Sequence, residues 1–321
     1  MAAATELRTP EVVELRQVRS GDLREMLRRE TEEWRAELDW DFYPSAELVE
    51  RFVAMRALGG FALIDGGRVA GYAYTVCEER KGLIGDLYVL PGHRTVGNEN
   101  LLLEAVLDGM MRTPYICRVE SQLMMLEGYF ERPFPREAYL SRHGRQFMTI
   151  DAGVAAGLAP GVVAERVRIE GCQDWQQDAA ARVIAAAYEG HVDSRINDQY
   201  RSVAGARRFL TNIVQYPGCG SFYQPGSFLA MDLSGGRMVG LSLASLIAAD
   251  VGHITQICVL PGVRGTGLGY ELLRRSLAAL GGAGCRKASL TVTSGNREAV
   301  RLYERMGFRT VKTFAATVWE W

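Results

Sequence analysis

The chain has few features that would assign it early to a class of protein. Its six cysteines form no Cys-x-x-Cys pair and its four histidines have no metal-ligand spacing, so the sequence indicates neither a disulfide framework nor a metal site. No apolar run approaches the roughly 20 residues that cross a bilayer. The segment Met1–Arg8 lacks the long apolar region of a signal peptide. We therefore expect free thiols, a cytoplasmic location and no metal.

An excess of charge of either sign is also missing. The 321 residues include 37 Lys and Arg and 38 Asp and Glu, for a formal net charge of -1. This balance offers no support for binding to nucleic acid or to a membrane surface. The length favours two domains, each large enough to bury its own core. We expect a monomer or a homodimer without a nucleic-acid or membrane partner.

A glycine-rich turn between an apolar strand and an amphipathic helix is the most informative feature of the sequence. The predicted strand Ile254–Leu260 leads to Gly265, Gly267 and Gly269. Glycines let a ligand approach the backbone closely, and the first N–H groups of a helix have no internal partner. Together with the helix dipole, they favour a pyrophosphate. The helix that follows places one apolar face inward: Leu268, Leu272, Leu273 and Leu277.

The residues around these glycines discriminate between the common phosphate-binding loops. A Walker A loop needs Gly-Lys-Ser/Thr, but Gly269 is followed by Tyr270 and Glu271. A dinucleotide fingerprint needs a small residue at 270, where this chain has the bulky Tyr270. The pattern Arg-x-x-Gly-x-Gly, formed by Arg264, Gly267 and Gly269, resembles the acetyl-CoA loop of the GCN5-related N-acetyltransferases (GNAT). The alternative is a glycine-rich turn that binds no ligand.

A second motif supports the same family. The segment Asn296–Phe308 resembles the signature of the family's fourth helix, and Gly307 suits the end of that helix. The resemblance implies that Tyr303 faces the sulfur of CoA. The predicted helix has one apolar and aromatic face, formed by Ala299, Leu302, Tyr303 and Met306.

The chain repeats one pattern at domain scale. Leu83–Arg94 aligns with His253–Arg264, and the same offset continues into the following helices. A repeat of this size indicates duplication rather than a solenoid. The segment Asp151–Gly161 is rich in small residues, as a linker would be, or forms a short helix ending at Pro160. We predict two domains, residues 1–154 and 155–321.

The two copies differ in the residues that would bind CoA. Glu99 stands where the second copy has Gly269, and we expect its carboxylate to face a pyrophosphate and repel it. The segment Ser121–Phe130 lacks the fourth-helix signature. We therefore predict a degenerate GNAT-like first domain that is not competent for CoA, and a catalytic second domain.

The resemblance implies an α/β fold for each domain. A mixed, mostly antiparallel central sheet would be flanked by helices and split in a V between its fourth and fifth strands. In the second half we expect helices at Trp175–Tyr188 and Val203–Val214, a polar loop over 191–200, and two final strands through Val311 and Val318.

The resemblance also implies a site. The backbone of Ile257, Cys258 and Val259 would contact the acyl carbonyl and the pantetheine amides. Asn296 would bond the pantetheine arm or cap its helix. Tyr303 would donate a proton to the departing thiolate. The remaining N–H groups would hold the pyrophosphate: Arg264, Gly265, Thr266, Gly267, Leu268, Gly269 and Tyr270.

The general base and the acceptor site are harder to assign. Many relatives carry a carboxylate on the fourth strand, where this chain has Thr255 and Gln256, and neither is a base near neutral pH. His253 is a weak candidate that we expect at the surface. The polar segment 191–200 is either an acceptor-binding loop or an ordinary exposed connection. Its candidate substrate residues are His191, Asp193, Asn197 and Tyr200.

The sequence thus predicts a CoA-dependent N-acyltransferase. It would transfer acetyl from acetyl-CoA to a primary amine of a small molecule or peptide, by direct attack in a ternary complex. Its tandem plan is similar to that of the mycothiol synthases, but no motif is specific enough to assign their substrate. One alternative is a non-catalytic acyl-CoA-binding sensor or regulatory module. Another is an acyltransferase whose first half binds a carrier-linked or peptide acceptor.

Overall fold

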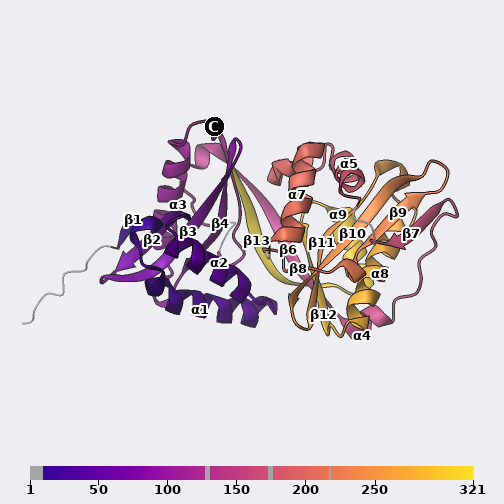
Figure 1. Ribbon diagram of the computed structural model, residues 1–321, viewed down its shortest axis with the longest axis horizontal. Coiled ribbons are helices and arrows are strands. Elements are labelled where there is room, and N and C mark those ends of the chain that lie inside the picture. Colours follow the sequence, from indigo (N-terminus) through magenta and orange to yellow (C-terminus); the bar gives the residue numbers. More distant parts are fainter. Residues whose placement is uncertain (1–9, 127–130, 173–175, 217) are drawn as a thin grey trace, which may run out of the picture. The chain divides into compact units, whose positions relative to one another are not determined.

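The computed structural model describes residues 10–126, 131–172, 176–216 and 218–321. The chain divides into two compact units, each an α/β unit with a mixed, mostly antiparallel sheet (Figure 1). The first unit comprises Met1–Glu37, Phe42–His143 and Phe314–Trp321. The second unit comprises Leu38–Asp41 and Gly144–Thr313. The predicted fold class is confirmed.

The first unit arranges its strands in the order β1-β2-β3-β4-β5-β13. The strands are β1 (Glu11–Glu14), β2 (Gly59–Asp65), β3 (Arg68–Glu78), β4 (Lys81–Val89), β5 (Arg118–Gln122) and the part of β13 (Arg309–Glu320) that begins at Phe314. The helices are α1 (Ser20–Leu38), α2 (Tyr43–Ala54) and α3 (Val96–Met111), with short 3-10 turns η1 (Leu15–Gln17), η2 (Pro91–His93) and η3 (Glu137–Tyr139).

The second unit has the order β6-β12-β11-β10-β9-β7, and β8 pairs with β10 beside this path. The strands are β6 (Leu140–Asp151), β7 (Val167–Gly171), β8 (Ser221–Phe222), β9 (Phe228–Asp232), β10 (Arg237–Ala248), β11 (Val251–Val259) and β12 (Lys287–Thr293). The helices are α4 (Ala152–Ala156), α5 (Gln177–Ala187), α6 (Asp193–Ile196), α7 (Val203–Gln215), α8 (Leu268–Gly282) and α9 (Arg297–Met306). The 3-10 turns are η4 (Asp198–Arg201), η5 (Gln224–Gly226) and η6 (Pro261–Val263).

Two strands pair within the unit opposite the one that the expected boundary near residue 155 gives them. They are β13, expected in the second domain, and β6, expected in the first. The end of β13 pairs with β5, and its Trp319 is buried in the core of the first unit. In turn, β6 pairs with β12, and its Met148 and Ile150 are buried in a core cluster of the second unit. The compact units are therefore not continuous in sequence. The segment after β6 begins with the short helix α4, which ends at Ala156 rather than at Pro160.

The sheet of the second unit splits where the sequence predicts a V. Strands β11 and β12 pair in parallel only over Val251–Ile254, and the rest of β11 has no register with β12. A β-bulge at Thr255 interrupts the pairing of β11 with β10 at the same level. In the first unit, β4 and β5 pair only over Lys81–Ile84, and Gly85 forms the equivalent bulge. The predicted split is confirmed, and both units repeat its local geometry.

Some local predictions differ from the structure. The segment predicted as a loop at 191–200 contains the helical turns α6 and η4. The two predicted final strands form one strand, β13, because no glycine or proline interrupts Arg309–Glu320. Helix α5 begins at Gln177, and the predicted start at Trp175 lies outside the described residues.

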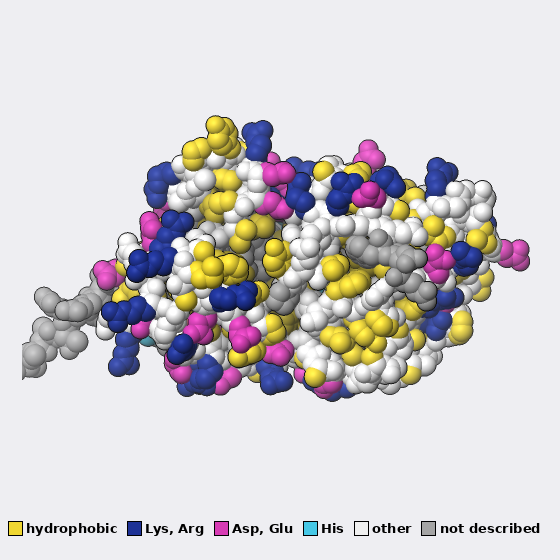
Figure 2. All heavy atoms as spheres, viewed as in Figure 1, with side chains coloured by type: hydrophobic (Ala, Val, Ile, Leu, Met, Phe, Trp, Pro, Cys, Tyr) yellow, Lys and Arg dark blue, Asp and Glu magenta, His cyan; other side chains and the backbone are white. Residues whose placement is uncertain are grey.

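The surface carries charges of both signs. Side chains of Lys and Arg are interspersed with those of Asp and Glu on the face drawn in Figure 2. On α1, Arg28 forms ion pairs with Glu25 and Glu32 along the exposed face of the helix. Within the described residues, the structure contains no helix long and apolar enough to cross a membrane.

Candidate active site

The glycine-rich loop joins β11 to α8 through the 3-10 turn η6. Gly267, the residue before α8, has a φ of 81°, a left-handed conformation that glycine adopts without strain. A Cβ atom there would lie 2.7 Å from the carbonyl oxygen of Val162, so the position excludes any larger residue. Gly267 also has no side chain with which to cap α8. The first N–H groups of the helix are therefore left for a ligand.

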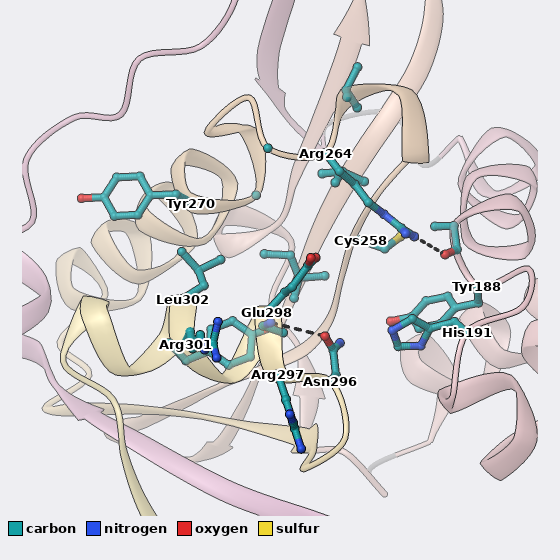
Figure 3. A pocket seen from close by; sticks show the side chains of 18 of the residues that line it. Tyr188, His191, Cys258, Arg264, Tyr270, Asn296, Arg297, Glu298, Arg301 and Leu302 are labelled. Atoms are coloured by element: carbon teal, nitrogen blue, oxygen red, sulfur yellow. Dashed lines mark hydrogen bonds between the residues drawn. The ribbon is translucent and has the colours of Figure 1, made fainter.

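Side chains of the loop hold it in place. Arg264 donates a hydrogen bond of 2.7 Å from Nη2 to the carbonyl oxygen of Ala187, at the end of α5 (Figure 3). Thr266 donates from Oγ1 to the carbonyl oxygen of Val263 at 2.8 Å. These contacts fix the backbone whose amides the resemblance assigns to the pyrophosphate.

The first turn of α8 carries one carboxylate, and its charge is balanced within the protein. Glu271 accepts hydrogen bonds from Arg274 at 2.7 Å, from Arg275 at 2.9 Å and from the backbone N–H of Gly161 at 2.9 Å. The Arg274 hydrogen bond is the largest influence on the pKa of Glu271; together with Arg275 and Gly161 it outweighs burial and lowers that pKa to about 2. Because these partners balance its charge, Glu271 does not oppose an anion at the loop.

Tyr270 points to the segment before β7, where its hydroxyl donates to the carbonyl oxygen of Ala159 at 2.7 Å.

A cavity of about 1250 Å³ opens beside the loop. Its walls are the end of β11, the loop, helix α9 and the segment that follows α5. Tyr188 and His191 lie across it from Arg301 and Leu302 (Figure 3). Among its described lining residues, one carboxylate, Glu298, accompanies four arginines: Arg264, Arg297, Arg301 and Arg305. This excess of positive charge suits an anionic ligand.

Tyr303 lines the cavity from α9. Its side chain is buried, and its ring lies 5.8 Å from that of Phe308. Burial, with a smaller contribution from Asp193, raises the pKa of Tyr303 well above its usual value. The hydroxyl therefore keeps its proton near neutral pH, and it forms no hydrogen bond within the described residues. It is available as a donor to whatever occupies the cavity.

Asn296 has the capping role that the sequence leaves open. Its Oδ1 accepts a hydrogen bond of 3.3 Å from the backbone N–H of Ala299, at the start of α9. The same residue lines the cavity, as do the predicted backbone contacts Ile257, Cys258 and Val259. Contact of these residues with a ligand stays a prediction.

The segment 191–200 contributes one of its predicted substrate residues to the cavity wall. His191 lines the cavity, and its Nδ1 accepts a hydrogen bond from the backbone N–H of Asp193 at 3.2 Å. The carboxylate of Asp193 is bound by Thr293 and by Arg145, whose Nη1 lies 3.1 Å away. Asn197 caps η4 through the N–H of Gln199. The last predicted residue, Tyr200, packs behind Tyr188.

Two residues that sequence reasoning did not place in the site form a polar network beside the cavity. Tyr188 lies directly after α5, and its ring stacks on that of Tyr200 with centroids 4.4 Å apart. Gln256 is 4% exposed and donates from Nε2 to the hydroxyl of Tyr188 at 3.1 Å. The sequence shows Gln256 on the fourth strand, but the bulge at Thr255 that aims it is set by pairing with β10.

His253 does not lie at the surface, so that expectation is wrong. It is 6% exposed, and its ring lies 5.2 Å from that of Trp40 and 6.1 Å from that of Phe147. Its Nδ1 lies 2.9 Å from Oγ of Ser289. Burial lowers the pKa of His253 to about 4, so the ring is neutral. It does not line the cavity as described, which argues against a role as the base.

Cys258 does line the cavity. Burial raises the pKa of its thiol to about 12, in spite of the opposing influence of Gln256 and Arg264. The residue is therefore a neutral thiol and not an activated nucleophile.

The corresponding loop of the first unit is occupied by its own side chains. Thr95 caps α3 by accepting a hydrogen bond of 3.1 Å from the N–H of Asn98. Glu99 is buried and lies 2.5 Å from Nη1 of Arg132. The expectation that Glu99 faces a pyrophosphate is wrong, because Arg132 holds the carboxylate inside the unit.

The split sheet, the uncapped glycine loop before α8 and the buried Tyr303 on α9 are the features that the resemblance to an acyltransferase family predicts. Residues 196–308 match the family described as the acetyltransferase (GNAT) family. The mycothiol acetyltransferase of Saccharopolyspora erythraea is 26% identical over 260 residues, which cover 76% of this chain and 80% of that protein.

Solved structures are similar over almost the whole chain. A GCN5-related N-acetyltransferase from Sphaerobacter thermophilus has a TM-score of 0.67 at 17% identity, covering 97% of this chain and 95% of that one. A tandem GNAT protein from the clavulanic acid biosynthesis pathway has a TM-score of 0.60 at 16% identity, covering 97% and 98%. Residues 196–308 therefore lie in a GNAT acetyltransferase domain, and the prediction of an N-acetyltransferase is confirmed. The chain as a whole has the fold of the tandem GNAT proteins.

Proposed function

We propose that the second unit transfers an acetyl group from acetyl-CoA to a primary amine of a small molecule or peptide. One observation carries this proposal. The uncapped amides at the start of α8 and the protonated hydroxyl of Tyr303 open on the same cavity. The first feature suits a pyrophosphate and the second a departing thiolate.

The backbone of β11 supports the same cosubstrate. Beyond Ile254 this strand pairs with β10 on one side and has no register with β12 on the other. The free edge includes Ile257, Cys258 and Val259, which line the cavity. An extended pantetheine arm with two amides could pair there as an added strand would. The four arginines of the lining would balance the phosphates.

The residues support direct transfer. The amine nitrogen would form a bond to the thioester carbon, and the carbon–sulfur bond would break. Tyr303 would give its proton to the sulfur, and the tyrosinate would regain the proton that the nitrogen releases. One positioned acid contributes roughly 10²–10⁴-fold to such a rate. Cys258 stays a thiol and takes no part as a nucleophile.

The acceptor would enter beside His191, on the side of the cavity opposite Arg301. The hydrogen bond between Asp193 and Arg145 holds the segment that follows His191 in place. The curated relative is named as a mycothiol acetyltransferase, which supports a small-molecule acceptor. All six cysteines are free, in keeping with our proposal that the reaction takes place in the reducing cytoplasm.

One experiment separates this enzyme from a sensor that binds acyl-CoA without turnover. The observation that favours the sensor is the lack of a carboxylate on the fourth strand, where the resemblance implies one in many relatives and this chain has Thr255 and Gln256. Calorimetry would measure CoA binding, and mass spectrometry would detect acetylated products from acetyl-CoA and a panel of amines. We expect binding and at least one acetylated amine. Binding without any product across small amines and peptides would favour the sensor, and absence of binding by folded protein would exclude both.

A further inference from the structure

The hydrogen bonds around Gln256 have a defined direction. The hydroxyl of Tyr200 donates to Oε1 of Gln256 at 3.4 Å, so this oxygen acts as an acceptor. Nε2 of the same amide donates to the hydroxyl oxygen of Tyr188 at 3.1 Å. Tyr188 is thus an acceptor in this bond, and its own hydrogen remains to be donated elsewhere.

No acceptor for that hydrogen is found within the described residues. The only hydrogen bond of the Tyr188 hydroxyl there is the one it receives from Gln256. Tyr188 lines the cavity, together with Cys258 and Tyr303. Both of these neighbours are close enough to add to the rise that burial causes in the pKa of Tyr188. The hydroxyl therefore stays protonated and adjoins the space where the resemblance places the thioester.

Packing fixes the ring that carries this hydroxyl. The ring of Tyr188 stacks on that of Tyr200, with centroids 4.4 Å apart, and meets the ring of His191 edge-on, with centroids 5.3 Å apart. Tyr200 in turn contacts Phe209 edge-on at 5.0 Å. A donor held by several aromatic contacts is preorganised, which is the property that makes electrostatic stabilisation of a transition state effective.

We propose that Tyr188 is a catalytic residue that donates a hydrogen bond to the acyl carbonyl oxygen as negative charge develops on it. Tyr200 and Gln256 are positioning residues that keep the Tyr188 hydrogen directed into the cavity. This inference rests on the acetyl-transfer function proposed above.

The carbonyl oxygen is the acceptor that fits a donor at this place. The attacking amine also has a lone pair, but a hydrogen bond to it would withdraw the electrons that must form the new bond. When nitrogen attacks, the carbonyl π electrons move to oxygen, and Tyr188 stabilises this charge without giving up its proton. When the carbon–sulfur bond breaks, these electrons return to the carbonyl, and Tyr303 protonates the sulfur. The two tyrosines thus serve different atoms.

The first test compares Tyr188→Phe and Tyr200→Phe with Tyr216→Phe, a control at an exposed tyrosine outside the cavity lining. Removal of one such donor costs about 10²–10³-fold in kcat. We expect a fall of about 100-fold for Tyr188→Phe, a smaller fall for Tyr200→Phe and none for the control. The dissociation constant of CoA and the KM of acetyl-CoA should stay within about twofold, because the bond strengthens only in the transition state.

The second test reverses the direction of the network. In Gln256→Glu both carboxylate oxygens are acceptors, so Tyr188 would donate to Glu instead of to the cavity. We expect kcat to fall about as much as in Tyr188→Phe. The rival expectation from the family is that a carboxylate on this strand acts as a base and raises the rate. A gain in kcat would therefore overturn the inference.

The outcomes also separate this inference from the proposed function. If the wild-type protein acetylates an amine and Tyr188→Phe does so with equal kcat, the inference is wrong and the function stands. If Tyr188→Phe lowers the affinity for CoA by the same factor as kcat, Tyr188 shapes the pocket and has no catalytic role. If the wild-type protein neither binds CoA nor forms product, the proposed function itself fails.

Discussion

The carboxylate of Glu99 lies 2.5 Å from Nη1 of Arg132, both side chains being buried in the first unit. Arg132 also donates to Oδ1 of Asn100 at 2.8 Å, and its guanidinium lies over the ring of Phe134. In the second unit the equivalent helix position is Gly269, where an added Cβ would meet only open space. The first unit has thus filled with side chains the place that the second leaves open, which supports our proposal that only the second binds CoA.

This difference predicts the effect of a charge at the loop. Gly269→Glu should weaken CoA binding at least 10-fold, because a carboxylate in the first turn of α8 opposes the pyrophosphate. Gly269→Ala should change it less than threefold, since the space is open. Calorimetry at low and high salt would measure both, and the loss in Gly269→Glu should shrink as salt rises. The matched control is Gly281→Glu near the other end of α8, and an equal loss there would show that the effect is not local.

The proton held by Tyr303 predicts a separation of chemistry from binding. Tyr303→Phe keeps the packing of α9 against its core cluster but removes the donor to the thiolate. We expect kcat to fall about 10²–10⁴-fold, with CoA affinity almost unchanged. Steady-state kinetics and calorimetry on the same preparation would show this. Equal turnover in the two proteins would remove Tyr303 from the mechanism.

Local features of the site could be predicted from the sequence, because each depends on residues close in the chain. The turn at Gly265–Gly269 and helix α8 follow from spacing alone, and the cap at Asn296 is one of the two roles that its place before a helix allows. The partner of Glu99 could not be predicted, since Arg132 is distant in sequence and has no pattern of its own. The same holds for Tyr188, whose contact with Gln256 depends on the bulge in β11.

The assignment of β6 and β13 to the two units differs more from the sequence prediction than any feature of the site does. The small-residue segment Asp151–Gly161 predicts a boundary that gives all earlier strands to the first domain and all later strands to the second. The periodicity of β6 and β13 gives their type but not their partners, because either sheet edge offers the same backbone hydrogen bonds. The pairing of β13 with β5 is a property of the folded chain that no local pattern records.

Two buried carboxyl groups predict how the stability of the first unit depends on pH. Glu30 is fully buried, accepts a hydrogen bond of 2.8 Å from the Tyr72 hydroxyl and adjoins Asp86. Burial, and then the charge of Asp86, raises the pKa of Glu30 well above its usual value. The folded unit therefore holds this proton more tightly than the unfolded chain. The resulting stabilisation is complete below the unfolded pKa of about 4.5 and is lost as pH rises through the folded value.

We expect Glu30→Gln to remove most of this pH dependence and to stabilise the unit at neutral pH, because the amide is neutral in both the folded and the unfolded state. Unfolding followed by tryptophan fluorescence, from below about pH 4.5 upward, would measure it. Trp34, which donates to Glu30 at 3.4 Å, is one of the five tryptophans of the chain. Glu25→Gln is the control, because Glu25 is exposed on the same helix. A mutant less stable than the wild type at neutral pH would show that the charged form of Glu30 is the native one.

The pairing of β13 with β5 predicts that a residue at the end of the chain stabilises the first unit. Trp319 is fully buried, donates from Nε1 to the carbonyl oxygen of Pro135 at 2.9 Å and meets the ring of Phe134 edge-on. Trp319→Ala should cost about 3–5 kcal/mol in that unit, through the cavity it leaves and the lost hydrogen bond. Hydrogen exchange read by mass spectrometry should speed up in β4 and β5 and stay unchanged in β11. Val311→Ala, at a half-exposed position of the same strand, should change neither the stability of the first unit nor the exchange rates in β4 and β5. Faster exchange confined to β11 and β12 in Trp319→Ala would contradict the assignment of the end of this strand, from Phe314 on, to the first unit.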